Sequence, residues 1–138
     1  MIINETMSLQ TKGHGDTIDV TSKIAQLVSR SKLKNGVITI FVTGSTAGVT
    51  TIEFEPNLVE DFREVWEDIA PENEEYHHDN TWGDNNGYAH VRASLLGPSL
   101  VVPFKDGELE LGTWQQVVVV DFDNRVRERH VVLQVMGE

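Results

Sequence analysis

Residues 117–120 are four consecutive valines. Neighbouring side chains of an extended strand point to opposite faces, so this segment is apolar on both. Strands of that kind are covered on both faces rather than solvated on one. The sequence therefore predicts a central strand at this position.

Other strands follow from runs of β-branched and aromatic residues. They are expected at residues 2–10, 37–42 and 49–54. Residues 100–104 and 108–111 flank a Lys-Asp-Gly turn and predict one hairpin. Residues 114–122 and 126–136 flank Asp123 and Asn124 and predict a second hairpin.

Helices are expected in three places. After a Gly-rich turn at residues 13–16, Thr21 can cap a helix, and another begins at Pro56 with Trp66 on its apolar stripe. A short helix at residues 89–96 ends at Gly97. The sum is an α+β fold, one domain over residues 1–138, with a mostly antiparallel sheet and two or three helices.

Composition excludes several classes of protein. The absence of cysteine rules out disulfides, thiolate metal sites and cysteine nucleophiles. A formal net charge of −11 argues against a nucleic-acid partner, which a basic face would bind. No segment has the apolar length of a membrane span, and the first residues lack a secretory pattern, so we expect a cytoplasmic protein and no membrane partner.

The segment between residues 71 and 87 is a long polar loop, a type that is often functional. His77, His78 and His90 fall within fourteen residues, with Asp79 and Asp84 among them. Imidazole and carboxylate groups are ligands for zinc and similar ions. The spacing matches no self-sufficient metal motif, so a solvated loop remains the alternative.

Two further segments attract interest. The glycine-flanked turn at residues 44–48 exposes amide and hydroxyl groups of Ser45 and Thr46, which can cradle an anion, although a plain β-turn explains it equally well. Gly112 stands shortly before Trp114 and a buried strand, a pattern typical of tight packing, and we expect Trp114 in the core.

Taken together, these segments resemble the YjbQ-like family, also described as secondary thiamine-phosphate synthases. The resemblance rests on residues 76–79, 83–99, 101–107 and 109–116, and on the upstream segments 44–48 and 50–56. It implies a small α+β fold that forms a homotrimer and binds a divalent metal, zinc in particular. It also implies a transferase that joins a thiazole phosphate to a pyrimidine diphosphate.

The resemblance assigns roles to individual residues. His78 and His90 would hold the metal and act in catalysis with Asp84. Contacts with the small phosphorylated substrate would come from Ser45, Thr46, Asn86, Arg92, Ser94, Lys105, Trp114 and Gln115. The leaving diphosphate requires cationic help from a metal or from basic side chains.

Two departures from the family pattern matter. Many relatives carry a histidine where Gly44 and Tyr88 stand, so this chain has fewer imidazoles for a metal. Two other interpretations stay open. One is a homotrimer that binds a metal or small anion without catalysis, and the other is a scaffold whose apolar strand faces drive assembly.

Overall fold

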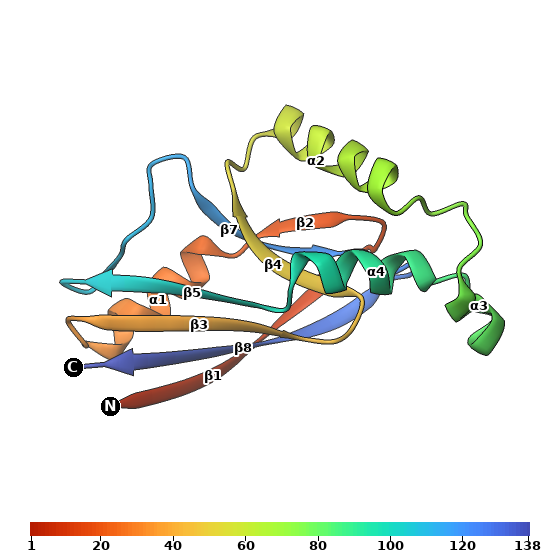
Figure 1. Cartoon of the computed structure of the whole chain (residues 1–138). Coiled ribbons are helices and arrows are strands. Elements are labelled where there is room, and N and C mark those ends of the chain that lie inside the picture. The colour runs from red at the N-terminus through yellow and green to blue at the C-terminus, as the bar shows by residue number, and fades with distance from the viewer.

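The computed structural model describes all 138 residues and contains two antiparallel sheets (Figure 1). The five-stranded sheet runs in the order β1 (Ile2–Thr11), β8 (Arg127–Gly137), β3 (Gly36–Thr43), β5 (Ser99–Lys105) and β6 (Glu108–Leu109). The three-stranded sheet runs in the order β2 (Asp16–Asp19), β7 (Gln116–Asp121) and β4 (Ala47–Ile52).

Strand β7 separates two apolar clusters, because its valines alternate between the faces of the three-stranded sheet. Val117 and Val119 point into the main core, which lies between the two sheets. Val118 and Val120 belong to a second cluster on the other face. All four valines are buried, and β7 is the middle strand of its sheet, so the prediction of a central strand is confirmed.

Helix α1 (Thr21–Ser31) covers one end of the main core with its predicted stripe, Ile24, Leu27 and Val28. Its predicted N-cap is wrong, since Thr21 is the first helical residue and Val20 occupies the cap position without a side-chain bond. Thr21 instead accepts a hydrogen bond through its Oγ1 from the Val117 amide, at 2.9 Å. The side chain thereby joins the helix to β7.

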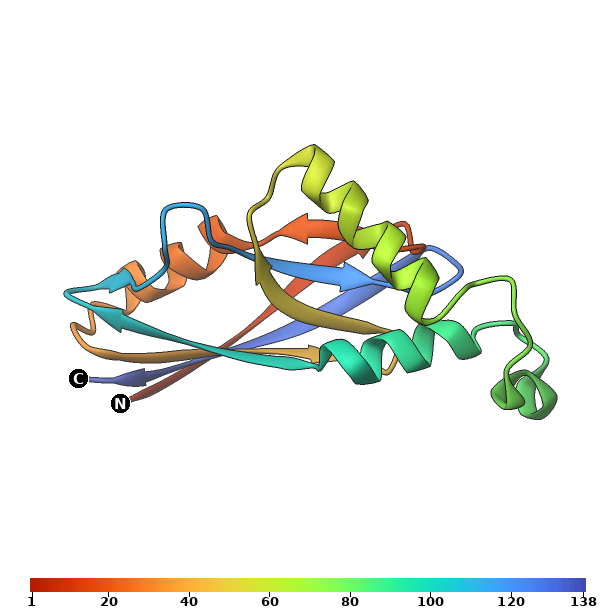
Figure 2. The ribbon, with the colours of Figure 1, turned by 45° about the horizontal axis from the view of Figure 1, so that its top comes forward.

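The second cluster lies between the three-stranded sheet and two helices, α2 (Pro56–Ile69) and α4 (Gly87–Leu96). Pro56 opens α2 as predicted, and Glu55 caps that helix by accepting from two amides. Trp66 is buried and its ring meets that of Phe122 edge-on at 5.0 Å, which confirms it as core. The turned view in Figure 2 shows α2 lying across the sheet, with α4 beside β4.

The fold class is confirmed as α+β and antiparallel, and four helices are present. Strand β2 and the short helix α3 (His77–Trp82) fall in segments expected to be irregular. The predicted second hairpin is wrong: β7 and β8 do not pair, because the chain crosses from one sheet to the other at residues 122–126. No helix has the length and apolar character needed to cross a membrane.

The outer face of the five-stranded sheet carries no helix in either view (Figures 1 and 2). Strand alternation and the pairing register identify the residues of β1, β8, β3 and β5 that point to this face. Lys105 and Glu128 lie at opposite ends of this face, and between them it carries no Asp, Glu, Lys or Arg. The residues of this middle part include Ile2, Asn4, Thr6, Val37, Thr39, Phe41, Val101, Pro103, Val132, Gln134 and Met136. We call this set the uncharged sheet face.

Candidate functional site

The candidate site forms where α3 approaches the start of α4, at one end of the molecule (Figure 1). The α3 segment is tied down through Asp79, whose carboxylate accepts from the amide of Tyr76 at 3.3 Å and from that of Gly87 at 3.2 Å. A Cβ on Gly87 would lie 2.5 Å from the Cβ of Tyr76. Glycine is therefore needed at this close approach.

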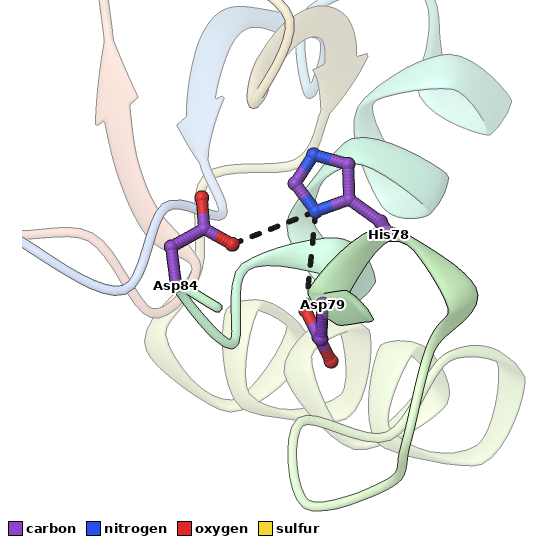
Figure 3. Close-up of side chains that lie close together, drawn as sticks. All are labelled: His78, Asp79 and Asp84. Atoms are coloured by element: carbon purple, nitrogen blue, oxygen red, sulfur yellow. Dashed lines mark ion pairs between the residues drawn. The ribbon is translucent and has the colours of Figure 1, made fainter. Parts of the chain in front are cut away.

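Three side chains converge on this junction (Figure 3). Nδ1 of His78 lies 3.5 Å from Oδ1 of Asp84 and 3.9 Å from Oδ1 of Asp79. The potential ligand atoms of the three residues lie within 4.8 Å of one another. His78 and Asp79 are partly buried, whereas Asp84 is exposed.

The 3.5 Å separation of His78 and Asp84 is that of two ligands of one metal ion, and the 3.9 Å separation of His78 and Asp79 is slightly longer. Zinc bonds to nitrogen and oxygen are 2.0–2.2 Å long, which puts neighbouring tetrahedral ligands about 3.3–3.6 Å apart. Nδ1 of His78 is also buried without any hydrogen-bond partner, although buried polar atoms are normally satisfied. The donor set and the unpaired nitrogen together fit a metal at these three residues.

His90, the other predicted metal ligand, lies on α4 directly beside His78. The centroids of the two rings are 4.3 Å apart, and the rings are tilted by 39°. Burial, followed by repulsion from His78, lowers the pKa of His90, so its imidazole is neutral at neutral pH. The structure thus brings both predicted histidines together, but the three clustered ligand atoms come from His78 and two aspartates.

Beneath the site lies a buried network of charged side chains. Asp121 accepts two hydrogen bonds from the guanidinium of Arg129, and both residues are buried. Asp123 accepts from Thr46, Asn86 and Arg127, while its other oxygen, Oδ1, has no partner. Burial by itself raises the pKa of Asp123, but these hydrogen bonds outweigh it and the pKa is lowered.

The turn between β3 and β4 borders His90 from the other side. A pocket of about 190 Å³ lies between this turn and α4. Ser45 and Ser94 line it together with His90, whereas Thr46 is buried and bonded to Asp123 and Arg129. Two of the predicted substrate-binding residues, Ser45 and Ser94, therefore line a pocket with His90.

The remaining predicted substrate contacts lie elsewhere or are engaged in packing. Asn86 is buried and links Asp123 to the Asn124 amide. Arg92 is buried and bridges α4 to α2 through Glu67 and the carbonyl of Ala70.

The last three of these residues lie far from α3. Lys105 ends β5, whose arrowhead lies at the opposite end of the molecule in Figure 1. Trp114 is 73% exposed, so its expected place in the core is wrong. Its neighbour Gln115 donates to the Thr51 hydroxyl. The structure does not assemble these side chains around the histidines.

Comparison with known proteins decides the family. A model of the YjbQ-like UPF0047 family matches residues 5–138. The chain belongs to this family. A UPF0047 protein of Archaeoglobus fulgidus is 33% identical over 130 residues, which cover 94% of this chain and 98% of the relative.

Solved structures of YjbQ-like relatives share the fold. A YbjQ-like protein of unknown function from Sulfolobus solfataricus P2 superimposes with a TM-score of 0.94 at 31% identity, covering 100% of this chain and 99% of that one. A hypothetical protein from Aeropyrum pernix K1 gives a TM-score of 0.91 at 32% identity, with 99% of both chains covered. The resemblance seen in the sequence is confirmed.

The predicted thiamine-phosphate synthase activity is wrong. The family is described only as UPF0047 and YjbQ-like, and the Sulfolobus relative as a protein of unknown function, with no such synthase named. The geometry gives a physical reason, since a leaving diphosphate needs cations beside it. Arg92 forms an ion pair with Glu67, and Lys105 lies at the other end of the fold.

Sequence reasoning missed two parts of the site. The sequence predicts Asp79 only as a companion of the histidines, yet its side chain both anchors α3 and faces His78. The Arg129 network was missed entirely, although a signal existed. Arg129 shares the inward face of β8 with Val131 and Leu133, and a charge in such a row requires a buried partner.

Proposed function

We propose that the protein binds a divalent metal ion, zinc in particular, at His78, Asp79 and Asp84, in an open centre that supports hydrolysis of a small substrate. The observation that carries this proposal is the buried, unpaired Nδ1 of His78 between two carboxylates. Two carboxylates also offset the charge of a divalent cation, in keeping with the acidic chain.

The metal ion, His90 and Asp79 would each have a different role at this centre. A divalent ion with three protein ligands keeps a position for water and lowers the pKa of that water. His90, neutral because of burial and its neighbour His78, accepts a proton at its imidazole. Asp79 orients the centre, because its carboxylate accepts hydrogen bonds from the amides of Tyr76 and Gly87 and so holds α3 against α4.

Metal binding is tested by calorimetric titration of zinc into metal-free protein. His78→Gln and Asp84→Asn should each weaken binding at least about 100-fold, since even indirect partners of ligands are worth 10- to 100-fold. His77→Gln is the matched control, because His77 neighbours His78 on α3 but lies outside the ligand group. Equal zinc affinity in His77→Gln and His78→Gln, or no stoichiometric binding, contradicts the proposal.

The hydrolytic part is tested separately with p-nitrophenyl acetate and p-nitrophenyl phosphate. Zinc-loaded protein should turn over at least one of them, and His90→Gln should slow turnover about 100-fold or more while zinc affinity stays close to that of the unchanged protein. Turnover that is unchanged in His90→Gln rules out the proton-accepting role. Absence of turnover with both probes reduces the proposal to metal binding.

We further propose that the protein assembles as a homotrimer through the uncharged sheet face. An uncharged strand surface is unexpected on a chain of net charge −11, and assembly removes such surfaces from water. Phe41→Glu, at a 42% exposed position of this face, should reduce the mass measured by light scattering to that of a monomer. Val126→Glu, at a 69% exposed position outside the face, is the control and should leave the mass unchanged.

The predicted cytoplasmic location remains part of this proposal. Cell fractionation with an antibody to the chain tests it. Recovery in the membrane or extracellular fraction contradicts it.

A further inference from the structure

The turn between β3 and β4 presents backbone donors that the protein leaves unused. The amide N–H groups of Gly44, Ser45 and Thr46 donate to no protein acceptor, whether backbone or side chain. Consecutive free amides of this kind form concavities that hold anions. The Thr46 carbonyl, by contrast, accepts from the amide of Phe122.

A buried arginine stands directly behind these amides. Arg129 is 7% exposed, and its Nε and Nη2 are bonded to Asp121 and Thr46. Its third nitrogen, Nη1, has no hydrogen-bond partner and is not enclosed, and it lies 2.7 Å from where a Cβ would stand on Gly44. A side chain on Gly44 would thus obstruct this guanidinium, and the φ of +145° also favours glycine there.

The pocket in front of the turn contains no acid. Its lining is made by Gly44, Ser45, Ala47, His90, Ala93, Ser94 and Pro98, in a chain with 22 Asp and Glu residues. The buried carboxylates behind it are compensated, Asp121 by Arg129 and Asp123 by Arg127. The remaining carboxylates nearby, Asp79 and Asp84, belong to the proposed metal centre, where a cation would neutralise them.

We propose that the Gly44–Thr46 turn, with Nη1 of Arg129 behind it, binds the oxyanion of the substrate, a carboxylate or a phosphate, beside His90. This inference rests on the proposed function for the identity of the site as a reaction centre, and it names the substrate class: a small molecule with an oxyanion next to the group that reacts. A pocket of about 190 Å³ accommodates such a group.

The test uses inorganic phosphate and acetate as probes, titrated by calorimetry into metal-free and zinc-loaded protein. Ser45→Glu and Ser45→Gln form a matched pair at an exposed position of the turn, with the same size and different charge. The glutamate variant should bind phosphate about tenfold more weakly than the glutamine variant, as expected for a unit charge roughly 6 Å from a dianion in a water-like medium. For acetate the expected ratio is about threefold.

The outcomes separate this inference from the proposed function. A glutamate-specific loss of either anion, in metal-free or zinc-loaded protein, supports the oxyanion subsite, and the probe that shows it identifies phosphate or carboxylate. Anion binding that is equal in the two variants, or absent in both protein forms, overturns it. Failure of zinc to bind, with a glutamate-specific loss still seen, defeats the metal centre and leaves the subsite standing.

Discussion

Replacing Tyr88 by phenylalanine should stabilise the protein. Tyr88 is 1% exposed in the second cluster, and its hydroxyl is buried with no hydrogen-bond partner. Burial raises the pKa of this phenol, so the group stays neutral but still loses its hydrogen bonds to water on folding. Its ring packs under the Arg92 guanidinium at 5.0 Å, a contact that phenylalanine keeps.

The expected gain follows from the cost of an unsatisfied polar group. Leaving a buried donor unpaired costs about 1–3 kcal/mol, and Tyr88→Phe removes that cost without opening a cavity. Tyr76→Phe is the matched control, because the Tyr76 hydroxyl donates to the Pro71 carbonyl at 2.7 Å. Losing this bond should destabilise by about 0.5–1.5 kcal/mol, so the two substitutions have opposite signs.

Urea denaturation measures both effects. The transition is followed by tryptophan fluorescence, since Trp66 lies in the same cluster as Tyr88. The midpoint should rise for Tyr88→Phe and fall for Tyr76→Phe, with the slope unchanged. A lower free energy of unfolding in Tyr88→Phe would contradict this prediction, because it would mean that the Tyr88 hydroxyl is hydrogen-bonded in solution.

Two more predictions concern the charged groups of the site. Arg129→Met should cost about 3–5 kcal/mol because Asp121 loses its buried partner. Arg127→Met should cost less, because the Arg127 side chain is 36% exposed and Asp123 keeps its hydrogen bonds from Thr46 and Asn86. Similar losses in denaturation would contradict this. In metal-free protein His90 should titrate by NMR below about 6.5, and His78→Gln should move its midpoint upward by removing the repulsion. The lowered pKa also implies that stability declines as the pH falls from about 6.5 toward the folded-state value, since the unfolded chain takes up that proton first.

Local patterns predicted the elements whose partners are determined by their own side chains. The valines of β7 require cover on both faces, and the sheet and helices provide it. The second hairpin failed because β8 finds its partners far away, in β1 and β3. Adjacent strands joined by a short turn usually pair. Here the end of β7 and the start of β8 are instead joined by ion pairs, Asp121 with Arg129 and Asp123 with Arg127.

The site was located by its residue types, while its geometry needed the fold. The histidines and Asp84 stand out in the sequence, and α3 and α4 bring them together. Helix α3 was not predicted, because its six residues show no helical spacing of apolar side chains and none of them is buried. Its start is marked only by Asp79, three residues after Tyr76, whose carboxylate accepts from the Tyr76 amide.

Helix α3 buries none of its residues. Its residues are therefore constrained differently from those of α4. His90 stands on α4, whose neighbours Tyr88 and Ala89 are packed in the second cluster, so changes there are limited by stability. Substitutions on α3 disturb little packing, so at the proposed metal centre they would act mainly through the ligands they add or remove. If α3 holds a metal as proposed, substitutions on this helix can therefore change the metal preference while the folded scaffold stays the same.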